Sequence, residues 1–409
     1  MVSFSRNFIL ILLFTTSSLL SCIPEDKITY TTPYQLVVAP QALGLDCSVS
    51  NVPEVEPMNG NNNLSLAWHK NRLYFVFRTS ETHFASANTR LYVLSSSDLG
   101  QTWRYETEVA TGRDMREPLL FSTGERLLLY SFAAGTNPLG FEPGPTYIVE
   151  MDSEGVWADP RIMTSEQGFA NWEDGHVVWR IRQVGNVFYM LRYSGGHYDI
   201  SGNSIVNIEF LKSTDGLNWL SVNPDRPVVY SGGGSEADFG LDKEGNLYSV
   251  IRVEDYDKDG YGSRVCFAPK EDITDWKCVC DKYRYDSPNI INRDGKVYLL
   301  ARRNLDGPYD KDMDWLPKSL RTAYYLIRYS LTKKHASLYI INQGTAPSVE
   351  WLFDFEGQNG DTSFFGVVPV NTHDYLVYNY SSEVGKDKTW IQGQLDPTFI
   401  YGTILKFRP

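Results

Sequence analysis

Short runs of strand-forming residues recur along the chain at intervals of roughly 50–80 residues. Each run has a polar first residue, five strand-forming residues and a polar or aromatic end. The copies are residues 72–78 (RLYFVFR), 126–132 (RLLLYSF), 186–192 (NVFYMLR), 246–252 (NLYSVIR), 296–302 (KVYLLAR) and 374–380 (DYLVYNY). A turn and a shorter apolar run precede each copy, as in residues 64–71 (LSLAWHKN). The repeat therefore predicts a series of antiparallel β-hairpins.

Further strand-like runs follow the hairpins. Examples are residues 89–96 (TRLYVLSS), 207–213 (NIEFLKS) and 324–330 (YYLIRYS). Repeating units of four strands are typical of a β-propeller. We predict an all-β chain that forms a β-propeller with four-stranded antiparallel blades. The copies indicate six blades, with seven as the alternative. The final repeat, which ends with residues 398–407 (TFIYGTILKF), lacks a strand, so we expect residues 34–40 (YQLVVAP) to complete it and close the ring.

Two of the turns share a pattern of Ser, Asp, Gly and Trp. They are Ser96-x-Asp98-x-Gly100-x-x-Trp103 and Ser213-x-Asp215-Gly216-x-x-Trp219, and residues 272–276 (DITDW) carry a third trace. The pattern resembles the Asp-box of sialidase-like propellers. In such a turn the Asp accepts hydrogen bonds from backbone N–H groups and the Trp packs under the hairpin. The resemblance implies a propeller fold and a structural role, and it says nothing about the reaction.

The N-terminal residues have the pattern of an export signal. Arg6 precedes an apolar run over residues 8–20, and the sequence LLSC ends at Cys22, which resembles the lipobox of bacterial lipoproteins. We expect residues 1–21 to be a signal peptide, residues 22–33 a tether and residues 34–409 a single propeller domain. The alternative is an ordinary secretory signal with a chance Cys. The expected location is the cell envelope, with membrane contact only through a lipid on Cys22.

The remaining cysteines include Cys266 and the pair Cys278 and Cys280, which flank a short turn. They fit either a disulfide or a small structural metal site. We expect no cofactor to be required for the reaction.

Charge limits the choice of partner. The formal net charge of −12 argues against nucleic acid. An anionic substrate would therefore need a local cluster of Arg or His in a cleft.

The topology of a blade indicates where such a cleft lies, because first strands begin and second strands end on the same face. First-strand starts carry Asn63, Arg116, Glu117, His176, Glu236, Ser287 and Thr362. Second-strand ends carry Arg78, Arg192, Tyr193, Arg252, Arg302, Arg303 and Tyr380. The loops on this face also hold His83 and His197. Repeated cations around one axis indicate an anionic ligand.

These residues suit β-elimination on a uronic acid, which needs the carboxylate neutralised and a base and an acid nearby. We predict binding roles for Arg78, His83, Arg116, Glu236, Arg252 and Arg302. Proton-transfer and carboxylate-binding roles are predicted for His176, His197, Tyr248 and Arg264. Blade packing is the alternative explanation for Tyr248, because Tyr74 and Tyr298 occupy the equivalent position.

The segment THFASANTRLYV around His83, and the spacing of His176 with His197 and of Tyr248 with Arg264, resemble the propeller-type ulvan lyases and the related ulvan-oligosaccharide dehydratase. This resemblance implies that His176 or His197 and Tyr248 handle protons while Arg264 binds the uronate. It also implies an acidic, ulvan-type saccharide as partner and a 4,5-unsaturated uronate as product. Those lyases are described as seven-bladed, whereas six repeats are found here.

Two alternatives stay open. A sialidase-like hydrolase is suggested by Glu236 and Arg252, but Phe364 and Phe365 stand where that family has its nucleophilic Tyr. The other alternative is a surface propeller that binds acidic glycans without turnover.

Overall fold

The computed structural model describes residues 28–44, 52–138, 140–164, 170–172, 175–197, 205–254, 260–311, 313–355 and 357–407, and for 28–33 it describes the backbone alone. The expected signal peptide, Cys22 and Cys47 lie outside this range. Within it, no helix is long and apolar enough to cross a membrane.

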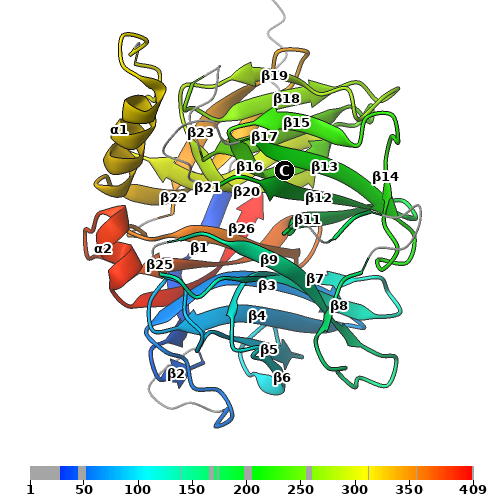
Figure 1. Ribbon diagram of the computed structural model, residues 1–409. Helices are drawn as coiled ribbons and strands as arrows, with labels where there is room; N and C mark the ends of the chain where they lie inside the picture. Colours follow the sequence, from blue (N-terminus) through cyan, green and yellow to red (C-terminus); the bar gives the residue numbers. More distant parts are fainter. Residues whose placement is uncertain are drawn as a thin grey trace, which may run out of the picture.

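Successive strands form groups of four antiparallel neighbours (Figure 1). The groups are β3 (Gly60–His69), β4 (Arg72–Ser80), β5 (Arg90–Ser96) and β6 (Arg104–Val109); β7 (Asp114–Ser122), β8 (Leu127–Ala134), β9 (Pro143–Met151) and β10 (Arg161–Ile162); β11 (Val177–Val184), β12 (Val187–Gly195), β13 (Val206–Ser213) and β14 (Leu220–Ser221), with β15 (Val228–Gly232) also on β13; β16 (Gly234–Leu241), β17 (Leu247–Val253), β18 (Arg264–Ala268) and β19 (Lys277–Cys280); β20 (Tyr285–Arg293), β21 (Lys296–Asn304), β22 (Lys334–Asn342) and β23 (Ser348–Asp354); and β24 (Ser363–Pro369), β25 (Asp374–Ser382), β26 (Thr398–Phe407) and β1 (Ile28–Ala39), which carries the short β2 (Ala42–Leu43).

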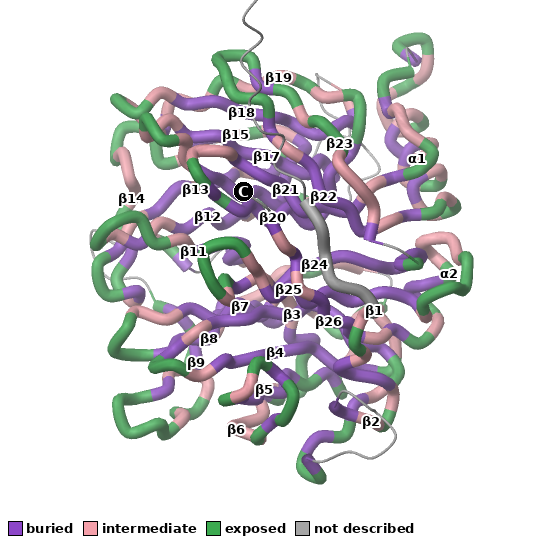
Figure 2. The backbone as a smooth tube through the Cα atoms, turned by 180° about the vertical axis from the view of Figure 1, so that it is seen from behind, coloured by how far each residue is buried: buried purple, intermediate pink, exposed green. Residues whose placement is uncertain are grey.

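The first strands of these groups follow one another around an axis. β3 lies next to β7, β7 next to β11, β11 next to β16, β16 next to β20, β20 next to β24, and β24 next to β3. Buried positions run along the strands, and exposed positions gather in the loops (Figure 2). The prediction of an all-β propeller with four-stranded antiparallel units is confirmed. The blade count stays a prediction, because a bridge between Gly60 and Thr398 joins two groups into one nine-stranded sheet.

The last group is closed by the N-terminal strand, as expected. β1 runs antiparallel to β26, with Leu36 opposite Tyr401 and Val38 opposite Ile400. Val37 and Val38 are fully buried in the main core cluster. The two ends of the described chain therefore stabilise each other through one shared sheet.

Both Asp-box turns have the expected geometry. Asp98 accepts hydrogen bonds from the backbone N–H and the hydroxyl of Thr102. Asp215 accepts from the backbone N–H of Leu217 and Asn218. Trp103 packs against Phe75 at a ring distance of 5.3 Å. These contacts explain why a tight turn between two strands carries an Asp and a Trp.

One expected strand is a helix. Residues 324–330, predicted as a strand, lie in α1 (Lys318–Ser330), and the third strand of that group is β22 instead. Thr322, Tyr325 and Tyr329 are buried at helical spacing, which a short apolar run does not distinguish from a strand. With α2 (Trp390–Leu395), α1 lies at one edge of the molecule (Figures 1 and 2).

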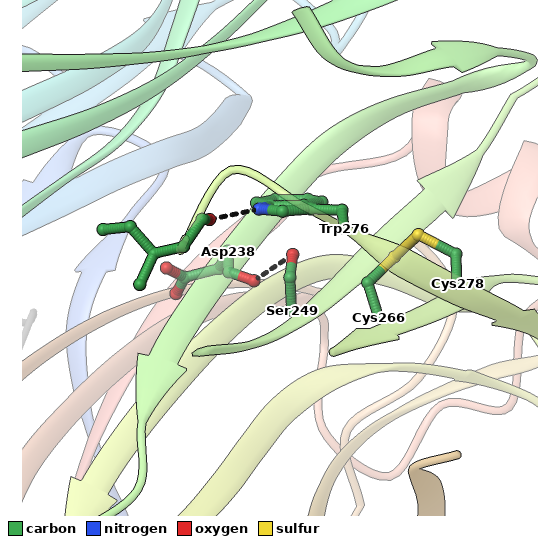
Figure 3. The surroundings of a disulfide bond; sticks show 6 residues. Asp238, Ser249, Cys266, Trp276 and Cys278 are labelled. Atoms are coloured by element: carbon green, nitrogen blue, oxygen red, sulfur yellow. Dashed lines mark hydrogen bonds between the residues drawn. A yellow bond between two sulfur atoms is a disulfide. The ribbon is translucent and has the colours of Figure 1, made fainter. Parts of the chain in front are cut away.

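Cys266 and Cys278 form a disulfide between directly opposed residues of β18 and β19 (Figure 3). This decides between the two expectations for these cysteines. Cys280 is exposed, and its sulfur accepts a hydrogen bond from the Arg264 guanidinium at 3.2 Å. The disulfide ties the outer strands of one group together, next to the third Asp-box trace at Trp276.

Candidate functional site

A cavity of about 360 Å³ opens on the face where first strands begin and second strands end. Most of its polar wall comes from these strand ends, with two residues from loops and one from α2. Its aromatic residues come from loops, α2 and β24. The polar wall consists of Asn63, His83, Asp114, Arg116, Glu117, Tyr193, Glu236, Arg252, Glu254, Ser287, Arg302, Tyr380 and Gln394. Phe84, Phe141, Phe364 and Trp390 are the aromatic residues of the apolar part. The topological rule used on the sequence therefore located the cavity correctly.

A β-bulge near the start of each first strand shapes this wall. The bulges fall between Asn62 and Leu64, Arg116 and Leu119, Val178 and Arg180, Gly234 and Ala237, Asp286 and Asn289, and Ser363 and Gly366. Four residues in them have left-handed backbones and line the cavity: Asn63 (φ 38°), Glu117 (φ 50°), Ser287 (φ 53°) and Phe364 (φ 58°). Such strained positions at a strand end re-aim side chains and cluster at functional sites.

The arginines of the wall are matched by carboxylates. Arg116 pairs with Asp114, which also accepts from Arg78 at 2.7 Å. Arg252 donates to Glu236 at 2.6 Å and to Glu254 at 3.2 Å. Four carboxylates and three guanidinium groups line the cavity. The sequence suggested a local cluster of cations, and the structure balances the guanidinium groups of this cavity with carboxylates.

Glu117 is the carboxylate with the most perturbed environment in this wall. Burial, followed by the nearby charge of Glu236, raises the pKa of Glu117 to about 8. Tyr193 donates a hydrogen bond of 3.3 Å to it. Glu117 therefore carries a proton at neutral pH.

Glu236 is held very differently. It receives the Arg252 guanidinium and, at 2.8 Å, the backbone N–H of Ser287. Burial raises its pKa, and Arg252 opposes that rise. The two carboxyl groups share one cavity, and the hydrogen bonds from Arg252 and Ser287 distinguish Glu236 from Glu117 as candidates for base and acid.

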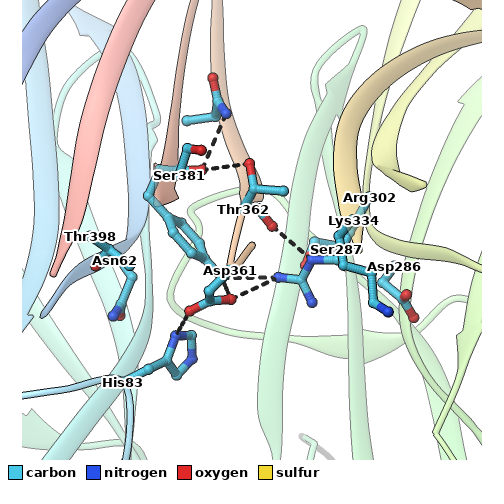
Figure 4. Close-up of polar contacts among 12 residues, drawn as sticks. Asn62, His83, Asp286, Ser287, Arg302, Lys334, Asp361, Thr362, Ser381 and Thr398 are labelled. Carbon is cyan, nitrogen blue, oxygen red and sulfur yellow. Dashed lines mark hydrogen bonds and ion pairs between the residues drawn. The ribbon is translucent and has the colours of Figure 1, made fainter. Parts of the chain in front are cut away.

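His83 and Asp361 form a second proton-handling pair. Asp361 lies between His83 and Arg302 (Figure 4), and the His83 Nδ1 is 2.5 Å from its Oδ2. Burial lowers the pKa of His83, against the opposing effect of Asp361. The imidazole is thus neutral at pH 7, and it lines the cavity with a 13% exposed side chain. Tyr380 donates to the other oxygen of Asp361 at 3.0 Å.

The structure brings some of the predicted residues together and separates others. His83, Arg116, Glu236, Arg252 and Arg302 line the cavity. Arg78 lies behind it and holds Asp114. His197 is also behind the wall, where its Nδ1 contacts Glu254 at 2.8 Å.

Three residues predicted to do chemistry lie elsewhere. His176 turns away from the cavity toward Glu209, and burial lowers its pKa to about 3. Tyr248 accepts a hydrogen bond from the backbone of Gly344, in the loop between β22 and β23. Arg264 is buried and donates to the carbonyl groups of Gly260 and Gly262. Their predicted roles at one shared site do not fit this geometry, because packing within the blades occupies all three.

Sequence reasoning placed Glu117 on the correct face without assigning it a role. It missed Glu254 and Asp361, whose signal was weak because they lie in loops just outside the strand ends. Among the described residues, no group of three or more His, Cys, Asp or Glu side chains is arranged to hold a metal ion.

Comparisons with known proteins place the fold. No protein-family model matches the sequence, and no curated protein matches it. A solved protein of unknown function from Dyadobacter fermentans is similar over 94% of this chain and 100% of its own, with a TM-score of 0.58 and 13% identity. A Trypanosoma rangeli sialidase mutant displaying trans-sialidase activity is similar over 92% of this chain, with a TM-score of 0.56 and 12% identity. The match spans 58% of that sialidase chain. The chain therefore shares the β-propeller fold of the sialidase-like structures.

Proposed function

We propose that the protein is a carbohydrate-active enzyme that cleaves a glycosidic bond by hydrolysis in this cavity. The observation that carries the proposal is the pairing of Glu117, protonated at neutral pH, with Glu236, which is hydrogen-bonded to Arg252. Glycoside hydrolases work with such a pair of carboxyl groups. The similarity to sialidase structures supports a saccharide as the substrate.

In this proposal Glu117 gives its proton to the glycosidic oxygen as the bond to the anomeric carbon breaks. Glu236 supplies the second carboxylate, as base toward water or as nucleophile. Arg252 and the Ser287 N–H donate hydrogen bonds to Glu236, and these contacts favour its charged form against the effect of burial. The oxygen of water becomes bonded to the anomeric carbon, and a proton of that water returns the two carboxyl groups to their starting protonation states. A tyrosine nucleophile is not supported, because burial raises the pKa of Tyr380 well above its usual value.

β-Elimination on a uronic acid is the second candidate, and the His83–Asp361 pair favours it. A neutral imidazole whose Nδ1 is bound to a carboxylate can accept a carbon-bound proton at Nε2. Two cavity arginines contact this pair: Arg116 donates to the His83 carbonyl at 2.8 Å, and Arg302 lies 3.6 Å from Asp361. The C5–H electrons form the C4=C5 double bond as the C4–O bond breaks. The leaving oxygen takes a proton from water, and His83 then returns its proton to the hydroxide that remains. Ulvan-type saccharides stay one substrate to be tested, although Tyr248 and Arg264 do not take the roles that the resemblance implied.

Mass spectrometry of products separates the two reactions. The protein is incubated with neutral, sialylated and uronate-containing oligosaccharides. Hydrolysis adds one water to the cleaved bond, whereas elimination adds none and creates an ultraviolet-absorbing unsaturated uronate. Glu117→Gln should abolish hydrolysis and His83→Asn should abolish elimination. Binding of glycans with no product from any substrate would favour the non-catalytic alternative and contradict the proposal.

We also propose that the protein is exported, that Cys22 carries a lipid and that the protein lies in the cell envelope. Mass spectrometry of the mature protein from its native membrane would identify a diacylglyceryl group on that cysteine. An unmodified Cys22 in the mature chain would contradict the anchor.

A further inference from the structure

Three polar groups that line the cavity have no hydrogen-bond partner within the described residues. They are Asn63 Oδ1, Gln394 Nε2 and Trp390 Nε1, and all three atoms are buried. Asn63 is 5% exposed and Gln394 is 5% exposed. Burying an amide or indole N–H without a partner costs free energy on the order of 1–3 kcal/mol. Unsatisfied groups on residues that line a cavity therefore indicate an occupant with complementary polar atoms.

The three groups come from two elements that are tied to each other. Thr398, three residues after α2, accepts through its hydroxyl from the Asn61 N–H at 2.9 Å. Asn61 stands two residues before Asn63 on β3. The link fixes α2 beside the start of β3, so that Gln394 and Asn63 belong to one wall.

α2 is also fixed against the proton-handling pair. The Gln394 carbonyl accepts from the His83 N–H, and Gly393 lies so close to Asp361 that a Cβ there would meet its backbone nitrogen at 2.1 Å. The Trp390 ring packs on Tyr329 at 5.1 Å, and Tyr329 accepts from Arg302. The unsatisfied groups are thus held rigidly next to the charged half of the cavity.

We propose that Asn63, Gln394 and Trp390 form an uncharged subsite that binds the hydroxyl groups of a sugar ring. A sugar hydroxyl both donates and accepts, so it can satisfy the Asn63 carbonyl oxygen and the two N–H donors. A carboxylate or phosphate would leave the Asn63 oxygen unsatisfied. The inference deepens the proposed function by giving the cavity a hydroxyl-recognising side next to the charged groups.

Binding to the full chain tests the subsite without turnover. Methyl glycosides of galactose, rhamnose and glucuronic acid serve as probes, with binding followed by saturation-transfer NMR and titration. Measurements use the wild type and Glu117→Gln, so that cleavage does not interfere. Gln394→Met keeps the side-chain length, and Trp390→Phe keeps the ring while removing the N–H. Each should weaken binding at least about fivefold, as expected for loss of one hydrogen bond.

Matched controls exclude a general loss of structure. Gln183→Met alters a glutamine in a separate cavity, and Trp315→Phe alters a tryptophan that is 78% exposed. Neither should change binding, and melting temperatures should agree across the set. If no methyl glycoside binds, or if Gln394→Met and Trp390→Phe bind like the wild type, the subsite is overturned. If glycosides bind through these residues but no bond is cleaved, the subsite stands and the proposed hydrolysis fails.

Discussion

Glu117 combines an unusual backbone with an unusual protonation state. Its left-handed φ of 50° is disfavoured for a residue with a side chain, and its pKa is raised to about 8. If Glu117 is the general acid, activity falls as pH rises through about 8. Glu117→Gln should lower kcat by about 10²-fold or more. A pH–rate profile checks the first statement and steady-state kinetics the second. Glu125→Gln, on an exposed turn, should behave like the wild type.

The same carboxyl group links stability to pH. Its folded-state pKa lies above the unfolded value, so its protonated form stabilises the fold below pH about 4.5. That contribution is lost progressively as pH rises through about 8. Glu117→Gln removes the effect, so the variant should gain in melting temperature relative to the wild type between pH 5 and 8.5. Parallel melting curves at both pH values test this, and a constant difference would contradict the raised pKa.

At the scale of individual residues, the sequence predicted on which face of the propeller a residue lies, but not whether its side chain points into the cavity. Asn63, Arg116, Glu117 and Glu236 were placed on the cavity face by counting from strand starts. His176 also stands at the start of a first strand, yet its side chain turns away from the cavity, because Glu209 and Arg192 form a polar cluster beside it. His176 lies before the bulge of its strand, whereas Asn63, Glu117 and Glu236 lie within theirs, and the position of a bulge leaves no pattern in residue types.

At the scale of the elements, the strained backbone conformations of the site lie in the bulged first strands. Ser287 has a left-handed φ of 53°, and its N–H holds Glu236. Ser287→Val places a β-branched residue in that conformation, at a cost of about 1–3 kcal/mol. It should lower the melting temperature and also reduce kcat by moving Glu236. Ser287→Gly should be tolerated. Ser348→Val, on an exposed strand position, is the matched control.

The Asp-box turns stabilise hairpins on the face away from the cavity. Asp98→Ala removes acceptors for two hydrogen bonds from Thr102, so it should destabilise the protein by about 1–3 kcal/mol in denaturant titrations. Activity per folded molecule should stay unchanged, because the turn does not line the cavity. A loss of activity at full stability would show that the turn acts on the site.

The elements themselves were largely readable from the sequence. Runs of strand-forming residues and turn residues predicted the strands, because the inner strands of the blades are buried on both faces and favour strand-forming residues along their length. α1 was predicted as a strand, since residues 324–327 are four consecutive apolar or aromatic residues. The segment is helical because it packs against Tyr261 and Tyr309, and these two residues are distant from it in the sequence.

At the scale of the whole molecule, the net charge of the protein differs from the net charge of the cavity wall. The chain carries a net charge of −12, yet the cavity wall has four carboxylates against three arginines. With Glu117 protonated, the two kinds of charge are equal. The acidic protein therefore holds a nearly neutral cavity, which suits an uncharged or singly charged sugar ring better than a polyanion.

Ring closure makes the fold depend on the pairing of β1 with β26. Each first strand packs on the next around the axis, so opening one group exposes the inner strands on both sides. Val38→Asp would place an unpaired charge at a fully buried position of β1 and should cost on the order of 3–5 kcal/mol. Because the groups are coupled around the ring, we expect one cooperative transition at a lower temperature in calorimetry. Gln35→Asp, at an exposed position of β1, should melt like the wild type. Two separate transitions in Val38→Asp would show that the groups unfold independently and that closure does not couple them.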